Sequence, residues 1–256
     1  MAARRGFSQR FGPTTVGLGA FLAALLVVEV LIRLDVIDGY VVPLPSQVAL
    51  AFERVVVEEG VVPRFLITAG ESLGAGLLVT LIGVPAGILL YRVRLLRMAT
   101  ETWVAALAAA PIVLVYPLFM VIFGRSIWTI IAIGTLAGLP PVILKTLEGL
   151  SAVRTVLVDV GRSYNLSNWR MFWSILFPAS IPSIFVGVRL GLIFAMINVV
   201  GVEFLINFGG LGPLINELAE RYDMPGTYAA IGFVVLVSIV FFVALERIEQ
   251  WLRPAR

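Results

Sequence analysis

Residues Asp159-Val160-Gly161-Arg162-Ser163-Tyr164-Asn165, followed after nine residues by Ile175-Leu176-Phe177-Pro178, form a polar segment between two long apolar runs. The apolar runs cover Ile127 to Leu144 and Ser183 to Ile206. Each approaches the roughly 20 apolar residues that a membrane-spanning helix needs. This arrangement predicts two membrane spans joined by a polar helical loop.

The composition of the whole chain agrees with a membrane protein. Hydrophobic residues make up 60% of its 256 residues, and the mean hydropathy is +1.02, whereas globular chains are roughly 45–50% apolar. Cysteine and histidine are absent, which excludes disulfides, thiolate or imidazole metal ligands and Cys/His nucleophiles. The only lysine, Lys145, follows Leu144 rather than glycine. The chain therefore lacks a P-loop, and we predict no nucleotide, metal or nucleic-acid site.

Six windows are long and apolar enough to span a bilayer. They are Thr14 to Ile32, Phe65 to Tyr91, Thr102 to Phe123, Ile127 to Leu144, Ser183 to Ile206, and Tyr228 to Leu245. We expect a single all-α transmembrane domain over residues 1–256, with a tail at 1–13 and a polar loop at 145–182. The first window has basic residues before it, but no small-residue cleavage pattern follows, so we expect it to be a span and not a signal peptide.

The charges predict the orientation of these spans, because short cytoplasmic loops are rich in Lys and Arg. Thirteen of the nineteen basic residues fall in four segments on one side: Arg4, Arg5, Arg10; Arg92, Arg94, Arg97; Lys145, Arg154, Arg162, Arg170; and Arg247, Arg253, Arg256. The opposite loops carry Asp35, Asp38, Glu53, Glu58, Glu59, Glu217, Glu220 and Asp223. We therefore expect both termini and the polar loop to be cytoplasmic.

Within the polar loop, the sequence predicts a short helix from Thr155 to Tyr164, with Thr155 as its N-cap. Leu157, Gly161 and Tyr164 then share one face at i, i+4 and i+7. Asn165 is suited to a positive φ where the chain turns.

The chain after this turn is predicted to be helical again. Ser167 would cap a second helix that ends at Pro178. In the outer loops, Ser46 is expected to cap a surface helix over Gln47 to Glu59. The glycines and prolines from Gly209 to Gly226 argue against a continuous helix there.

The order Asp159-Val160-Gly161, three residues, Asn165, nine residues, Ile175-Leu176-Phe177-Pro178 resembles the Glu-Ala-Ala loop signature of ABC-importer permeases. Leu139 to Leu150, Val188-Arg189-Leu190-Gly191, Gly201-Val202-Glu203, Pro43 to Ser46 and Gly209 to Gly212 are similar to segments of the nitrate, sulfonate and taurine permeases. The resemblance covers most of residues 43–256. It implies the type I ABC-importer permease fold in a bacterial inner membrane.

The resemblance also implies what the polar loop binds. Leu157, Asp159, Gly161, Tyr164, Asn165, Ile175 and Pro178 occupy the positions that contact the ATPase in such permeases. Leu157, Gly161 and Tyr164 would press into a groove, and Asp159 would pair with a basic or N–H-rich surface. Asp159 replaces the family's glutamate, and Asn165 replaces its glycine. ATP and Mg²⁺ would be bound by separate ATPase subunits, with no cofactor in this chain.

The implied assembly contains two permease copies, expected to be a homodimer in lipid, two ATPase subunits and an extracytoplasmic solute-binding protein. Its solute would be a nitrate-, sulfonate- or taurine-like anion or a related small organic compound. A pyrimidine-type vitamin precursor or an aromatic acid is the alternative. A stand-alone secondary transporter or channel and an intramembrane enzyme are the rival classes. The chain lacks histidine, cysteine and paired intramembrane aspartates, the residues that the chemistry of these two classes would use.

Charged residues inside the spans are costly and mark functional sites or interfaces. Arg189 and Glu203 fall on one face of the fifth window but about 21 Å apart at 1.5 Å per residue, so they cannot pair. With Asn198 between them, they are candidates for lining the solute pathway, the alternative being that both reach the membrane interfaces. Glu29, Glu71 and Glu101 are expected at interfaces.

Overall fold

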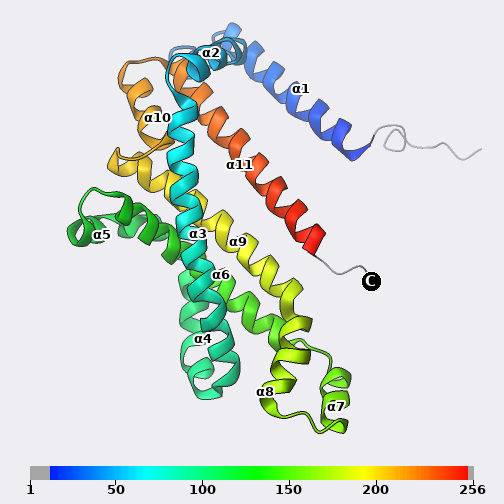
Figure 1. The fold of residues 1–256 in the computed structure, drawn as a ribbon. Helices are drawn as coiled ribbons and strands as arrows, with labels where there is room; N and C mark the ends of the chain where they lie inside the picture. Colours follow the sequence, from blue (N-terminus) through cyan, green and yellow to red (C-terminus); the bar gives the residue numbers. More distant parts are fainter. Residues whose placement is uncertain (1–11, 253–256) are drawn as a thin grey trace, which may run out of the picture. The chain divides into compact units, whose positions relative to one another are not determined.

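The computed structural model describes residues 12–252, and every regular element in that range is a helix (Figure 1). Arg4, Arg5, Arg10, Arg253 and Arg256, used above for the orientation, lie outside the described residues. The elements are α1 (Pro13–Arg33), α2 (Pro45–Val57), α3 (Val61–Arg92), α4 (Arg94–Ala109), a 3₁₀ turn η2 (Ile112–Val115), α5 (Tyr116–Phe123), α6 (Ile127–Ser151), α7 (Thr155–Ser163), α8 (Asn168–Met171), a π-turn η3 (Phe172–Leu176), α9 (Phe177–Ile206), α10 (Leu211–Glu220) and α11 (Met224–Leu252).

Membrane spans account for most of these helices. Five continuous helical segments are long and apolar enough to cross a bilayer: Thr15–Arg33, Val61–Arg92, Ile127–Ser151, Asn168–Ile206 and Met224–Arg247. Together, α4 and the Ile112–Phe123 segment make a sixth candidate, with a 94° bend between them. The predicted six-span, all-α class is confirmed, with one span broken.

The break lies at Ala110-Pro111, inside the window expected to be one span. The residue before a proline is held out of the helical region by the proline ring. Ala110 accordingly adopts φ −76° and ψ 139°, and α4 ends at Ala109. The chain resumes as the 3₁₀ turn η2 and then α5, which has Pro117 in its first turn, where a missing N–H costs nothing.

The described chain forms two compact units. One comprises the residues up to Val61 with Ile215–Phe233, and the other comprises Val62–Leu214 with the residues from Val234 onward. The single domain over residues 1–256 stays a prediction.

In the larger unit, α6 packs along α9 through small residues (Figure 1). A Cβ on Gly138 would lie 2.6 Å from the carbonyl oxygen of Gly191, and a Cβ on Gly191 would lie 2.8 Å from that of Gly138. Only glycine allows the two backbones to approach this closely. In a membrane, where lipid competes for apolar surface, such close packing is a main source of helix association.

A hydrophobic core continues along this helix pair. Its fully buried members include Ile130 and Ile133 from α6 with Val199 and Val202 from α9, and Ile112 of η2 packs against it. The core therefore fixes α9, the helix that carries the three pathway candidates and continues back into the polar loop.

In the smaller unit, α1 and α2 are joined through Glu29. Its carboxylate accepts hydrogen bonds from the backbone N–H and the hydroxyl of Ser46, at 3.1 and 2.9 Å, and pairs with Arg33. The prediction that Ser46 caps α2 is wrong, because Pro45 already has helical geometry at N1 and Leu44 becomes the N-cap. The Ser46 hydroxyl is free to bind Glu29 instead.

Candidate functional site

The polar loop folds as a helical hairpin of α7 and α8. After α7 the chain turns at Asn165, which has φ 49° as predicted, and the N–H of Leu166 donates to the carbonyl of Gly161 at 3.1 Å. An α-helix commonly ends in this way, with one residue in the left-handed conformation just after its last turn. Ser167 then caps α8, its hydroxyl accepting the N–H of Arg170 at 3.4 Å, as predicted. Thr155 is not a cap: it is the first helical residue, after Arg154.

Gly161 lies inside this hairpin, not on its exposed face with Leu157 and Tyr164. A Cβ at Gly161 would meet the Sδ and Cε atoms of Met171 at 2.6 Å and the Cδ1 atom of Ile175 at 2.7 Å. Helical spacing alone predicted that Gly161 shares an exposed face with Leu157 and Tyr164, but the chain that returns through α8 and η3 covers the glycine. The small residue is therefore needed where α7 packs onto the end of α8 and onto η3.

The outer face of α7 is apolar and exposed. Leu157, Val160 and Tyr164 are 41%, 47% and 77% exposed, and Val156 adjoins them. Asp159 forms an ion pair with Arg162 of its own helix at 3.1 Å, with both side chains exposed. Such a surface pair contributes little, so it does not prevent Asp159 from meeting another charged surface.

Pro178 does not end the second helix, contrary to the sequence-based expectation. The chain stays helical from Asn168 to Ile206. The π-turn η3 ends at Leu176, two residues before Pro178. Proline has no N–H, and in a regular helix its ring would clash with the carbonyl four residues earlier. The wider π-turn is a known way to accommodate such an irregularity, and it places Ile175, half-buried, against Gly161.

The upstream end of the loop also differs from the prediction. Helix α6 extends to Ser151, past the predicted span end at Leu144 and past the Pro140-Pro141 pair. The non-helical part of the predicted loop 145–182 is therefore confined to the short segments on either side of α7.

A second polar site, which we call the latch, is centred on Glu203 near the end of α9. This side chain has no exposed surface. Its oxygens accept the hydroxyl of Thr68, at 2.8 and 3.0 Å, and the backbone N–H of Gly212, at 3.0 Å. The Thr68 oxygen in turn accepts the N–H of Leu211 at 3.0 Å. The latch fastens the segment after α9 to helix α3.

Glu71 belongs to the same site and is buried, not interfacial as expected from the sequence. It lies one helical turn after Thr68 on α3, and therefore on the same face. A Cβ at Gly209 would lie 3.3 Å from both Oε1 of Glu203 and Oε2 of Glu71. With φ +103°, Gly209 also has a backbone conformation that side chains rarely adopt.

The other two pathway candidates lie apart from the latch. The guanidinium of Arg189 lies 5.7 Å from the ring centre of Phe242 in α11. Asn198 donates from Nδ2 to the carbonyl of Phe194 in its own helix, at 2.9 Å. Their role in the pathway stays a prediction, as does that of Glu203.

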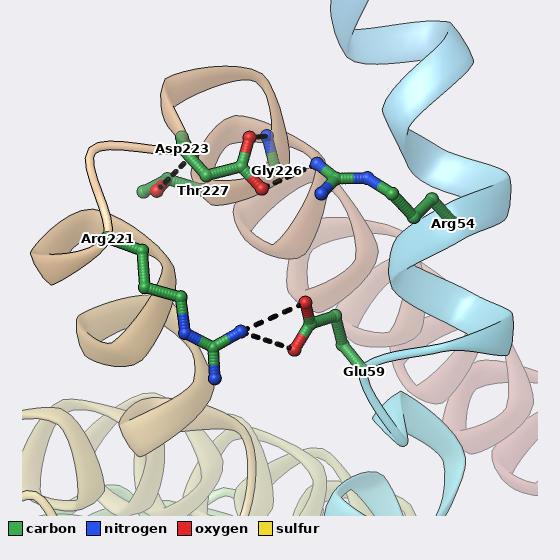
Figure 2. Close-up of polar contacts among 6 residues, drawn as sticks. All are labelled: Arg54, Glu59, Arg221, Asp223, Gly226 and Thr227. Atoms are coloured by element: carbon green, nitrogen blue, oxygen red, sulfur yellow. Dashed lines mark hydrogen bonds and ion pairs between the residues drawn. The ribbon is translucent and has the colours of Figure 1, made fainter.

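The smaller unit contains two ion pairs, which we call the clamp, that hold α2 and the residues just after it to the chain around the start of α11 (Figure 2). Arg54 pairs with Asp223, and Arg221 pairs with Glu59 at 3.1 Å. Asp223 also caps α11, accepting the N–H of Gly226 at 3.0 Å. The prediction that Gly209–Gly226 is not one continuous helix is confirmed, because the chain is non-helical at Gly209-Gly210, before α10, and again between α10 and α11.

We expect Asp223→Ala to destabilise the protein more than Glu59→Ala, because Asp223 serves both as a helix cap and in an ion pair. A lost cap costs about 1 kcal/mol, and an exposed pair about 0–1 kcal/mol. Asp223→Asn, which keeps a capping oxygen but not the charge, is the matched control and should match Glu59→Ala. Thermal melting of the purified complex measures this order, and equal losses for the Ala and Asn variants of Asp223 would contradict it.

Sequence reasoning missed the partners on α3. Thr68, Glu71 and Ser72 are polar at i, i+3 and i+4 within an apolar span, a pattern that marks one buried polar face. It also missed Arg92, which lies over the rings of Phe172 and Trp169. Within residues 12–252 no group of three acidic side chains is arranged to hold a metal ion.

The family described as the inner membrane component of binding-protein-dependent transport systems matches residues 80–254. The chain belongs to this family, whose members are permease subunits and not themselves enzymes. It is thus the membrane subunit of an ABC importer, a class defined by partner ATPase and solute-binding proteins.

Relatives of known assignment align over nearly the whole chain. The formylaminopyrimidine transport permease ThiX of Halalkalibacterium halodurans is 24% identical and aligns over 92% of this chain and 94% of its own. The riboflavin permease RibX of Chloroflexus aurantiacus is 27% identical, over 95% and 91%. The taurine permease TauC of Escherichia coli is 23% identical, over 94% and 89%.

The fold is similar to that of a solved transporter. An inward-facing structure of the MetNI methionine ABC transporter superposes with a TM-score of 0.66 at 19% identity, covering 76% of this chain and 96% of the matched one. The predicted type I importer permease fold is confirmed by this likeness and by the family match.

Proposed function

We propose that the hairpin of α7 and α8 is the surface on which the importer's ATPase docks. The carrying observation is the exposed apolar row of Val156, Leu157, Val160 and Tyr164 on a short helix outside the predicted spans. Exposed apolar patches of this kind mark protein interfaces. The nearby residues Asp159, Asn165, Ile175 and Pro178 shape the hairpin, and Gly161 holds it closed from inside.

The proposed orientation places this hairpin and both termini in the cytoplasm. ATP and Mg²⁺ then bind only to the ATPase partners, and this chain carries no cofactor. The solute-binding protein docks on the opposite side, at the loops that the charge pattern predicts to be extracytoplasmic. A second copy of the chain completes a homodimeric pathway, with Arg189, Asn198 and Glu203 as its candidate lining residues and lipid around the exposed apolar helix faces.

The proposed solute is a small compound with a pyrimidine-type ring. Support comes from two relatives aligned over more than nine-tenths of this chain, which are named for formylaminopyrimidine and for riboflavin, whose ring system includes a pyrimidine.

A taurine-like anion is the second candidate, because TauC aligns over 94% of the chain. The discriminating experiment is uptake by cells expressing the complete importer, with labelled formylaminopyrimidine and labelled taurine compared. We expect uptake of the pyrimidine that is abolished when the ATPase is inactivated, and no uptake of taurine. Uptake of taurine alone would overturn the pyrimidine proposal and leave the importer assignment standing.

A further inference from the structure

We propose that Arg92 is a positioning residue that links the ATPase-docking hairpin to helix α3 by stacking on two aromatic rings. The inference rests on the proposed docking of the ATPase at α7 and α8. It adds a third transmembrane helix to the two, α6 and α9, that the hairpin joins through the chain itself.

The contact is specific in geometry. Arg92 is the last residue of α3. Its guanidinium carbon lies 4.3 Å from the ring centre of Phe172 and 5.8 Å from that of Trp169. Both distances lie within the roughly 6 Å at which a cation is attracted to an aromatic face. A planar guanidinium can in addition lie flat against such faces, whereas the ammonium of lysine is a compact point charge that keeps only part of the attraction to the rings.

The rings that Arg92 contacts belong to the docking hairpin and its continuation, Trp169 in α8 and Phe172 in η3. Phe172 is buried and is the first residue of the π-turn η3. Its neighbour Met171 fills the space against Gly161 of α7. Contacts therefore run without a gap from the exposed helix α7, through Met171 and Phe172, to the end of α3. A π-turn in a helix commonly marks a functional deformation point.

A cavity of about 460 Å³ lies beside the stacked side chains. Its lining residues are Tyr91, Arg92, Asn168, Trp169, Met171, Phe172 and Leu176. The end of α3 and the hairpin thus meet with Arg92 bridging them and open space alongside. Space of this kind lets the hairpin shift while the stacked contact is kept.

A simpler role for Arg92 would be to anchor the end of α3 at the membrane interface, where arginine and aromatic side chains collect. The two roles differ in what they require. Anchoring needs only a positive charge on a long stem, and lysine provides it. The contact with the rings also uses the plane of the guanidinium, so Arg92→Lys weakens it and leaves the anchor intact, whereas Trp169→Leu removes one ring and leaves the charge in place.

The test uses the complete importer reconstituted in proteoliposomes, with solute uptake, ATP hydrolysis and bound ATPase measured on the same samples. For Arg92→Lys we expect uptake per ATP hydrolysed to fall about two- to fivefold, with the ATPase still bound, because lysine loses the planar contact but keeps part of the attraction to the rings. Trp169→Leu, at an exposed ring, should show the same uncoupling, and adding it to Arg92→Lys should cause little further loss. Arg94→Lys is the matched control and should couple as the wild type does.

The outcomes distinguish the stacking role of Arg92 from the docking of the ATPase on the hairpin. If Arg92→Lys transports as much solute per ATP hydrolysed as the wild type, with the ATPase bound, the stacking role is overturned and the docking proposal is left intact. Full additivity of Arg92→Lys and Trp169→Leu would also overturn it, because residues acting through one contact cannot lose it twice. Failure of even the wild-type chain to retain the ATPase would instead overturn the docking proposal.

Discussion

Replacement of Gly161 by leucine is expected to abolish ATP-driven uptake while the membrane spans still insert. A Cβ at this position already falls 2.6–2.7 Å from side-chain atoms of Met171 and Ile175. A full leucine side chain must therefore push α7 away from the helix that follows it. Overpacking of this kind costs about 1–3 kcal/mol where it can be relieved, and here relief means opening the hairpin.

Two companion variants show whether the clash is the cause. Gly161→Ala adds only the Cβ, which meets the mobile ends of Met171 and Ile175, so we expect most uptake to remain. Gly161→Leu combined with Met171→Ala frees space for the leucine and should restore part of the uptake. Gly17→Leu, where nothing lies within 4 Å of the added Cβ, is the matched control and should behave as the wild type does.

ATP-dependent uptake and the amount of ATPase that copurifies are the two measurements for this series. Both should fall together in Gly161→Leu, because the hairpin is the proposed docking surface. Wild-type uptake by Gly161→Leu would show that close packing inside the hairpin is not needed for coupling.

Replacement of Glu203 by leucine is expected to be the most destabilising change in the spans. Leucine cannot accept the hydrogen bonds from Gly212 N–H and the Thr68 hydroxyl, and both lie in a buried site. Each buried donor left without a partner costs about 1–3 kcal/mol. The segment between α9 and α10 should then detach from α3, and little assembled complex should be recovered.

Glu203→Gln keeps a carbonyl oxygen and nearly the same volume. We expect it to assemble and to reduce uptake, because one of the two oxygens that accept hydrogen bonds from Thr68 and Gly212 becomes an NH₂ group. Glu148→Leu is the control at an exposed glutamate, whose surface pair with Lys145 contributes little. Melting temperature and yield of the complex measure the assembly. Equal stability of Glu203→Leu and Glu148→Leu would show that the latch does not hold the fold.

Local chemistry explains which parts of the hairpin could be predicted from the sequence. The left-handed turn at Asn165 and the cap at Ser167 depend on a few neighbouring residues, and both are found. The short helix over Thr155–Ser163 is found for the same reason. The caps predicted at Thr155 and Ser46 failed because the residue before a helix is set by how the chain enters it, and each helix begins earlier than expected.

The errors of larger consequence come from contacts between distant residues. Helical spacing put Gly161 on the face of Leu157 and Tyr164, but Met171 and Ile175 of the returning chain decide that it is covered. The general effect of proline on helices predicted that a helix ends at Pro178, but the chain stays helical there, with the π-turn η3 just before it.

The same limit applies in the spans. Glu203 was recognised as an unusual intramembrane charge, but its partner Thr68 lies 135 positions earlier in the chain. No pattern along α9 identifies such a partner. The helix breaks and the polar residues within the spans could be predicted from the sequence. The partners of those polar residues could be identified only from the packed helices of the structure.

The central claim is that the exposed face of α7 contacts the ATPase on the cytoplasmic side, and site-directed cross-linking tests it most directly. The chain has no cysteine, so single cysteines can be placed at Tyr164 and at Tyr40, which are similarly exposed at 77% and 70%. In the complete importer, Tyr164→Cys should cross-link to the ATPase, and Tyr40→Cys, in a predicted outer loop, should not. A cross-link to the ATPase from Tyr40→Cys, or none from Tyr164→Cys, would contradict the account.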